Sequence, residues 1–246
     1  MVSATQAPLP AWSAPSSERG RASRLRAVAL VGIDGSGKTT QAQSLADALS
    51  ASGHPATYHR NAGGRRWLGR AANRLGRGEA QRLVGRDGML LVESVLRWLA
   101  IAAALLAGWF TGRTAVMDRY AVCQYASLRA HGGQRWERLV RAAYRIFPQP
   151  QVTFLMAVHP AEAYRRIERR GTDQESLTYL TAAEHAYRTL PEYPTFVVVD
   201  ATRSPEEVAQ AIQAYLTGWW AAQDQARCGV RVANPVAPVA PAQARP

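Results

Sequence analysis

Short apolar runs alternate with longer helical patterns along most of the chain. The runs are rich in Val, Ala and Leu, as strands buried on both faces should be. They occupy residues 25–31, 56–60, 114–118, 152–158 and 195–200. The helical patterns lie between them, at about 40–51, 88–110, 121–130, 135–146, 160–169, 175–189 and 205–222. This alternation predicts an α/β fold, with a five-stranded parallel sheet and helices on both of its faces.

The stretch 89–110 is the most apolar part of the sequence. A membrane-spanning helix needs about 20 predominantly apolar residues. Glu93 and Arg97 interrupt this stretch and leave 99–110 as its uncharged remainder. The pattern therefore favours a buried helix or a dimer interface over a membrane span. We expect a homodimer formed through helix 89–110 and no association with a membrane.

The two ends of the chain differ in composition from its middle. Residues 1–24 are rich in Ala, Ser, Pro and Arg, and 229–246 is a low-complexity sequence of Pro, Ala and Val. Both compositions are typical of disorder. The chain has 246 residues, enough for one substantial α/β domain. We predict a disordered tail at 1–24, a folded domain at 25–222 and a low-complexity disordered tail at 223–246.

The formal net charge of +12 raises the question of a nucleic-acid partner. The arginines are spread along the chain and no basic motif interleaved with aromatic residues is present, so the sequence favours small anionic ligands over nucleic acid. The two cysteines, Cys123 and Cys228, lack metal-binding spacing and are too few for a disulfide framework. Since the N-terminus carries no hydrophobic signal segment, we expect a cytoplasmic protein.

The only lysine among thirty basic residues is Lys38, in the segment GIDGSGKT at 32–39. This segment matches G-x-x-x-x-G-K-[ST] between a predicted strand and a predicted helix, which is the setting of a P-loop. The loop's N–H groups cradle phosphates, and a slim ammonium reaches the β- and γ-phosphates where a planar guanidinium would not serve. The Thr39 hydroxyl is suited to Mg²⁺. The candidate ATP-binding residues are Gly32, Asp34, Gly35, Ser36, Gly37, Lys38, Thr39 and Thr40.

A second motif, Asp118-Arg119-Tyr120, ends the predicted strand 114–118. Ligands of open α/β sheets gather at the carboxyl ends of the strands. An acid at that position can hold Mg²⁺ or its water, and an adjacent arginine can grip a phosphoryl group with two hydrogen bonds. Standing alone, the tripeptide would favour an ordinary salt bridge at a strand end.

These motifs resemble those of the thymidylate kinase family of nucleoside monophosphate kinases, and the likeness runs over about residues 26–215. The segment GIDGSGKTTQ at 32–41 is similar to the family's P-loop, which also has a carboxylate at its third position. The sequence RNAGG at 60–64 resembles the family's R-x-P-G-G. Asp118-Arg119-Tyr120 resembles its D-R-Y.

The likeness continues beyond these motifs. Arg97 lies close to the position of the family's base-contacting arginine. The sequence YRRIERRG at 164–171, followed by Asp173 and Glu175, resembles the family's arginine-bearing lid. The segment 196–212 resembles its last strand and helix. The resemblance implies a P-loop kinase with a mobile lid near 166–176 that uses ATP and Mg²⁺.

The resemblance also implies a role for each motif residue. Lys38 and Thr39 hold ATP and its Mg²⁺, with Asp118 as the second residue of the metal site. On the acceptor side, the implied substrate-binding residues are Asp34 at the sugar hydroxyl, Arg60 and Arg119 at the phosphate, Arg97 and Gln124 at the base, and Asp118, Tyr120 and Ser127 around them. The implied catalytic residues are Lys38, Arg119 and the lid arginines Arg166 and Arg170, with Arg169 as a further lid candidate. A solvated helix face, paired through Glu168, is the alternative for the lid arginines.

Departures from the family pattern cluster on the acceptor side. Cys123 stands where the family has serine, Ser127 where an aromatic ring usually crowds the 2′ position of the sugar, and Glu93 one turn before Arg97 where an aromatic would stack on the base. The predicted function is ATP-dependent phosphorylation of a nucleoside monophosphate, dTMP to dTDP. The alternatives are a related kinase with another phosphorylated or hydroxyl acceptor, and a P-loop module that senses nucleotides without transferring phosphate.

Overall fold

The structure is a computed structural model that describes residues 25–61, 80–171 and 175–227. The two predicted tails, apart from residues 223–227, lie outside the described residues. So do Ala62, Gly63 and Gly64 of the second motif and Asp173 of the predicted lid.

Among the described residues, five strands form one parallel sheet in the order β2-β3-β1-β4-β5. The strands are β1 (Ala27–Val31), β2 (Ala56–Arg60), β3 (Thr114–Asp118), β4 (Val152–Ala157) and β5 (Val197–Asp200). The α-helices are α1 (Lys38–Ala51), α3 (Ala80–Thr111), α4 (Ala121–Ala130), α5 (Gln134–Tyr144), α6 (Pro160–Arg170), α7 (Leu177–Arg188) and α8 (Pro205–Arg227), and a short 3-10 helix, η1, spans Tyr193–Thr195. The predicted α/β fold and its parallel sheet are confirmed.

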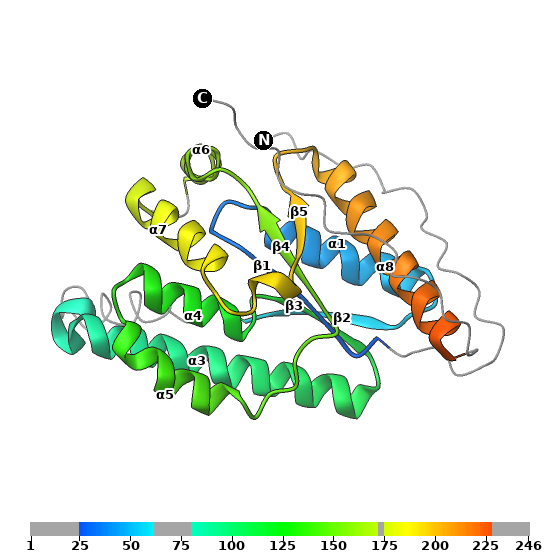
Figure 1. The fold of residues 1–246 in the computed structure, drawn as a ribbon, viewed down its shortest axis with the longest axis horizontal. Coiled ribbons are helices and arrows are strands. Elements are labelled where there is room, and N and C mark those ends of the chain that lie inside the picture. Colours follow the sequence, from blue (N-terminus) through cyan, green and yellow to red (C-terminus); the bar gives the residue numbers. More distant parts are fainter. Residues whose placement is uncertain (1–24, 62–79, 172–174, 228–246) are drawn as a thin grey trace.

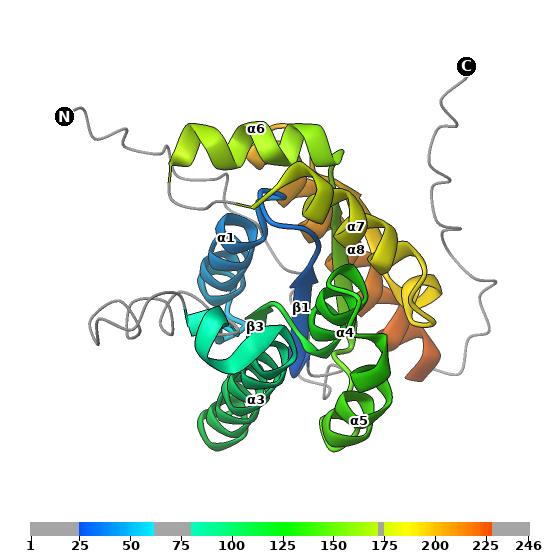
Figure 2. The ribbon, with the colours of Figure 1, turned by 90° about the vertical axis from the view of Figure 1, so that its left-hand side faces the viewer.

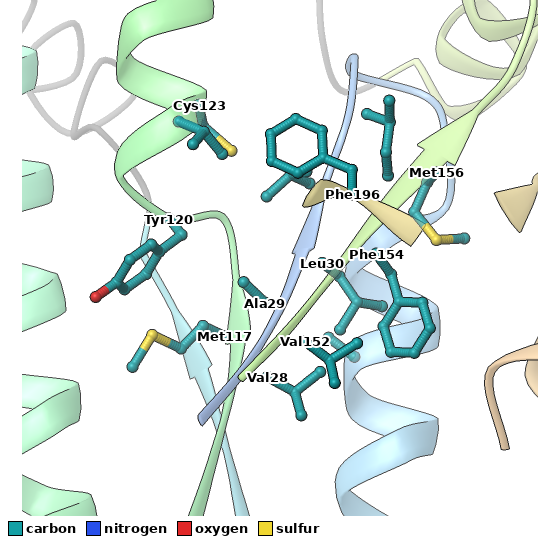
Figure 3. Close-up of a cluster of buried hydrophobic side chains, with 14 of the residues drawn as sticks. Val28, Ala29, Leu30, Met117, Tyr120, Cys123, Val152, Phe154, Met156 and Phe196 are labelled. Atoms are coloured by element: carbon teal, nitrogen blue, oxygen red, sulfur yellow. The ribbon is translucent and has the colours of Figure 1, made fainter. Parts of the chain in front are cut away.

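Helices cover both faces of the sheet. Helices α1 and α8 pack together on one face, and α3, α4 and α7 cover the other, as Figures 1 and 2 show. Every residue of β1 and β3 is buried, because these strands lie inside the sheet and are covered from both sides. Figure 3 shows part of the resulting core, with Val28 and Leu30 on the same side of the sheet as Phe154 and with Met117 on the other side.

Two helix ends differ from the prediction by five residues or more. Helix α3 begins at Ala80, eight residues before the expected start at 88, because the Arg and Gly residues of this segment hide its helical pattern in the sequence. Helix α8 continues to Arg227 through the helix-forming sequence AAQDQAR. The predicted tail at 223–246 is therefore wrong in its first five residues, which are helical.

Helix α3 is the one described helix that is long and apolar enough to cross a membrane by length and composition, over Gly88–Thr111. A third of its most apolar window is buried inside the protein. Leu90, Ile101 and Ala104 belong to the core on one side of the helix. Leu99 and Leu106, on its other side, are exposed.

Candidate active site

Three neighbouring strands bring the sequence motifs to one edge of the sheet. In the parallel register, Leu30 of β1 and Arg60 of β2 both pair with Asp118 of β3. The glycine-rich segment follows β1 directly and leads into α1. The carboxyl ends of these strands therefore place the P-loop beside Asp118 and Arg119, which is the arrangement expected for a ligand site in an open α/β sheet.

The glycine-rich loop is closely packed against the structure around it. Gly32 has φ 137°, and a Cβ atom there would lie 2.8 Å from the carbonyl oxygen of Met156. Gly35 has φ 83°, and a Cβ atom there would clash with the backbone of Ala163 on α6. Both positions require glycine for backbone conformation and for space. The loop is thus held in one shape by β4 and α6.

Lys38 lies inside this loop rather than in solvent. Its side chain is 4 % exposed, and its Nζ donates hydrogen bonds to the carbonyl oxygen of Ile33 and, at 3.3 Å, to Oγ of Ser36. A carboxylate oxygen of Asp34 lies 3.7 Å from Nζ. Burial, followed by the nearby positive charge of Arg119, lowers the pKa of Lys38 to about 8. Phosphate oxygens entering the loop would supply the negative charge that favours the ammonium.

Asp34 and Arg119 form an ion pair across the loop. Burial alone would raise the pKa of Asp34, but the cations of Arg119 and Lys38 outweigh it and hold that pKa well below its usual range. Among the described residues, Arg119 is the one non-glycine residue with a positive φ, at 79°. Non-glycine residues in this region are uncommon and cluster at functional sites. The strained backbone directs the Arg119 side chain towards the P-loop.

Asp118 connects the P-loop helix to the neighbouring strand. Its Oδ2 accepts hydrogen bonds from Oγ1 of Thr39 at 2.6 Å and from the phenol of Tyr58 at 3.2 Å. Its Oδ1 is buried and has no hydrogen-bonding partner among the described residues. A free carboxylate oxygen beside a threonine hydroxyl provides the hard oxygen ligands that Mg²⁺ prefers, and Mg²⁺ is usually held by one or two carboxylates together with substrate phosphates. Thr39 and Asp118 therefore fit the metal that the sequence implies.

A second group of polar side chains is buried between α3 and α4. Arg97 of α3 is 2 % exposed and pairs with Glu93 at 2.8 Å, while its Nε and second terminal nitrogen have no partner among the described residues. Gln124 and Ser127 of α4 are buried, and neither side chain has a hydrogen-bonding partner within the described part of the chain. Arg97 is close enough to Asp34 to lower its pKa. The group thus lies within electrostatic range of the P-loop.

Three other predicted site residues do not belong to either of these two groups. The hydroxyl of Tyr120 donates to the carbonyl oxygen of Pro148, and its buried ring lies in the core on the same side of the sheet as Met117 (Figure 3). Arg60 is exposed at the end of β2. Arg166 pairs with Glu162 and donates to the carbonyl oxygen of Ala201 at 2.8 Å.

The predicted lid begins in a helix, because residues 166–170 form the last turns of α6. Arg169 and Arg170 are exposed there, and residues 172–174 lie outside the described residues. Thr40 is exposed on the first turn of α1.

Two tyrosines of this region were not singled out by the sequence. Tyr58 reaches Asp118 from β2, and Tyr187 of α7 hydrogen-bonds to Cys123. Burial and then Cys123 raise the pKa of Tyr187 well above its ordinary value. A tyrosine in a strand or an amphipathic helix is usually a packing residue, so no signal in the sequence marks either one.

Comparison with known proteins agrees with this geometry. A family model described as thymidylate kinase matches residues 30–212, which include the P-loop, Asp118 and the first turns of α8. The chain belongs to the thymidylate kinase family. Members of the thymidylate kinase family use ATP, which agrees with the ATP site that the sequence predicts at the P-loop and its lysine.

The chain matches curated thymidylate kinases over nearly the whole length of those relatives. A probable thymidylate kinase of Archaeoglobus fulgidus is 30 % identical over 192 residues, which cover 76 % of this chain and 92 % of the relative. The thymidylate kinase of Deinococcus radiodurans is 30 % identical over 195 residues, covering 76 % and 94 %. That of Hahella chejuensis is 27 % identical over 197 residues, covering 75 % and 92 %.

Proposed function

We propose that this protein is a thymidylate kinase that transfers the γ-phosphoryl group of ATP to dTMP, forming dTDP and ADP. The observation that carries the proposal is the bonded network of Lys38, Asp34 and Arg119 around a P-loop, in a chain of this family. The network places two cations beside the loop that cradles phosphates. Phosphoryl transfer needs this arrangement, because its transition state spreads negative charge over the equatorial oxygens.

The chemistry requires positioning and charge more than acid–base catalysis. An oxygen of the acceptor phosphate, already an anion, forms the new bond to the γ-phosphorus. The bond between the γ-phosphorus and the oxygen that bridges the β- and γ-phosphates breaks, and ADP leaves with that oxygen. No strong general base is needed. Lys38 stabilises the donor phosphates, and Arg119 is positioned by Asp34 to stabilise charge at the transferring group or the acceptor phosphate.

Mg²⁺ would be held by Thr39 and Asp118, the first through its hydroxyl and the second through its free carboxylate oxygen or a water. When bound, the ion neutralises charge on the β- and γ-phosphates. The protein's own contribution is to hold these two oxygens at the sheet edge, where a buried carboxylate is kept in place by hydrogen bonds.

The acceptor would bind on the side of Arg97, Gln124 and Ser127. Their buried polar atoms without partners are suited to a ligand that brings hydrogen-bonding groups of its own, such as a base and a sugar. Arg60, exposed at the adjacent strand end, is available for the acceptor phosphate. We include Arg166 and Arg170 of α6 as lid arginines, with Arg166 leaving its bond to Ala201 when the lid closes.

Purified protein tests this proposal with ATP, MgCl₂ and dTMP, and chromatography measures the dTDP formed. The expected result is dTDP formation that requires ATP and dTMP together and is lost when Lys38 is replaced. Formation of ADP without dTDP, or no turnover at all, would contradict it. A parallel panel of nucleoside monophosphates and nucleosides identifies the acceptor.

A related kinase with a different acceptor is the second candidate. It is favoured by the buried Glu93–Arg97 pair, which puts a charged group where an aromatic ring would stack on thymine. A higher kcat/KM for another member of the panel than for dTMP would establish it. ATP binding without phosphorylation of any acceptor would instead indicate a nucleotide-sensing module.

We further propose that the exposed face of α3 forms a homodimer. Val95, Leu99, Leu106 and Phe110 recur on one side of the helix and are about half exposed or more. No charged residue lies between Trp98 and Gly112, so this face is complementary to a copy of itself. A membrane span is disfavoured because the opposite side of the same helix packs into the core.

Analytical ultracentrifugation tests the dimer. The wild-type protein should sediment as a dimer at micromolar concentration, and the double variant Leu99→Glu, Leu106→Glu as a monomer. Leu177→Glu, which replaces an exposed leucine on α7, is the matched control and should stay dimeric. A monomeric wild type, or a wild type recovered with lipid vesicles, would contradict the proposal.

A further inference from the structure

Tyr58 contacts the phosphate-binding edge of the sheet from β2, outside the P-loop and outside the Asp118-Arg119-Tyr120 motif. It lies in β2, two residues before Arg60, and its side chain is only partly buried. Its phenol donates to Oδ2 of Asp118 at 3.2 Å, across the β2–β3 pair. The same Oδ2 accepts the hydroxyl of Thr39 from the other side, at the start of α1. Three separate elements thus meet at one carboxylate oxygen.

The two oxygens of Asp118 are used unequally. Oδ2 accepts two hydrogen bonds, whereas the buried Oδ1 accepts none within the described part of the chain. A buried carboxylate oxygen without a donor is costly unless a ligand completes it. We propose that Tyr58 is a positioning residue of the metal–nucleotide site: its phenol fixes the orientation of the Asp118 carboxylate so that Oδ1 stays available to a divalent cation or its water.

Thr39 alone cannot perform this task equally well. Its hydroxyl has one hydrogen, which it donates to Asp118, and its oxygen lone pairs remain for a cation. If those lone pairs bound the ion, the same hydroxyl would serve both the metal and the carboxylate. Tyr58 supplies a second donor from β2, an element separate from the loop and helix that hold the ATP phosphates. Partners of this kind, which orient a metal ligand without binding the metal, typically change metal affinity about ten- to a hundredfold when they are removed.

Tyr58→Phe is a well-defined test because it keeps the ring and removes the hydroxyl. The inference rests on the proposed Mg²⁺–ATP site but not on the identity of the acceptor. Isothermal titration calorimetry would therefore measure ATP binding to the full chain without an acceptor, once with MgCl₂ and once with EDTA. The ratio of the two affinities is the gain due to Mg²⁺.

For wild-type protein we expect ATP to bind more tightly with Mg²⁺ than with EDTA. In Tyr58→Phe this gain should fall about tenfold, while the affinity in EDTA and the urea denaturation midpoint stay close to wild type. The matched control is Tyr215→Phe, which removes an exposed phenol on α8, outside the nucleotide site. This control should leave the gain unchanged.

A double-variant cycle connects the effect to Asp118. In an Asp118→Asn background, adding Tyr58→Phe should change the gain by less than about twofold, because the carboxylate it orients is gone. An unchanged gain in Tyr58→Phe, an equal loss in Tyr215→Phe, or a full effect in the Asp118→Asn background would each overturn the assignment of Tyr58. A wild type whose ATP affinity does not respond to Mg²⁺ would overturn the proposed Mg²⁺–ATP site as well. Failure of Tyr58 and failure of that site are therefore distinguishable.

Discussion

The donor side and the acceptor side of this site differ in how their buried polar groups are satisfied. Around the P-loop, Lys38, Thr39 and Asp34 are all bonded to neighbouring residues before any ligand is present. Between α3 and α4, the side chains of Gln124 and Ser127 are buried without a hydrogen-bonding partner among the described residues. On the donor side, within the described part of the chain, a single carboxylate oxygen, Oδ1 of Asp118, is left for a ligand, whereas on the acceptor side the polar groups of whole side chains are left for one.

This difference shows where specificity lies. A preformed phosphate site binds any nucleotide that presents the right phosphates, because its contacts go to groups that all nucleoside triphosphates share. A buried donor or acceptor without a partner costs about 1–3 kcal/mol. A ligand that supplies the missing partner recovers that cost, and one that does not is rejected. We therefore expect substitutions on the donor side to abolish turnover and those on the acceptor side to change which substrate is used.

Lys38→Ala should have the largest effect. The variant removes a buried charge that contributes several kcal/mol to the transition state, so kcat should fall about a hundredfold or more with the circular dichroism spectrum unchanged. Lys38→Arg is the control for charge, and we expect a large loss there too, because the loop has no room for a guanidinium. Activity of Lys38→Ala within threefold of wild type would contradict the P-loop kinase proposal.

Arg97→Ala should have the next largest effect, on the acceptor alone. Loss of a charged hydrogen-bond donor is expected to raise the acceptor's KM about ten- to a hundredfold and to leave the KM for ATP nearly unchanged. Steady-state kinetics with each substrate varied in turn measures both values. This selective change would confirm that the two sides act separately.

Glu93→Ala controls for a structural role of the same pair. Breaking a buried ion pair leaves one charge unpaired and costs about 3–5 kcal/mol of stability. If Arg97→Ala and Glu93→Ala lower the free energy of unfolding equally and both leave the kinetics of the folded enzyme unchanged, Arg97 has a structural role only.

Ser127 should produce a smaller effect, on the choice of sugar. Serine leaves space where the family pattern has an aromatic ring, and a roomy pocket discriminates between similar ligands by only about 1–3 kcal/mol. We expect wild-type kcat/KM values for ribo- and deoxyribonucleotide acceptors to differ by less than about a hundredfold. Ser127→Tyr should increase the preference for the deoxy form about tenfold, whereas Ser127→Ala keeps the space and should not. Complete rejection of ribonucleotides by wild type would place another residue beside the sugar.

The donor side could be predicted from sequence because its chemistry is local. Lys38 and Thr39 are adjacent, and a strand, a glycine loop and a helix place them without reference to the rest of the chain. Strands β1 and β3 were predictable for a similar reason, since strands buried on both faces are recognisable from composition. Tyr58 was not predictable, because its role depends on the pairing of β2 with β3.

The acceptor side depends on contacts between distant segments. The resemblance placed Arg97 and Gln124 near the base, but whether their polar atoms are bonded depends on how α3 packs on α4. The same limit applies to Arg166, whose bond to Ala201 joins α6 to the end of β5. Helix ends also depend on packing, and α3 begins in a segment whose sequence shows no clear pattern.

Gln124 gives the smallest expected effect and the most direct test of the difference between the two sides. Its amide is fully buried without a partner, so replacing it with Met, of similar volume, removes a polar group whose burial is uncompensated. We expect Gln124→Met to raise the free energy of unfolding of the free protein by about 1 kcal/mol and to raise the acceptor's KM. Gln41→Met is the matched control, because Gln41 on α1 is also buried but donates to the carbonyl oxygen of Pro205 at 2.8 Å. That variant should lose about 1 kcal/mol. Urea denaturation of both variants decides the matter: if both lose stability alike, the amide of Gln124 is already satisfied in the free protein, and the acceptor side is as complete as the donor side.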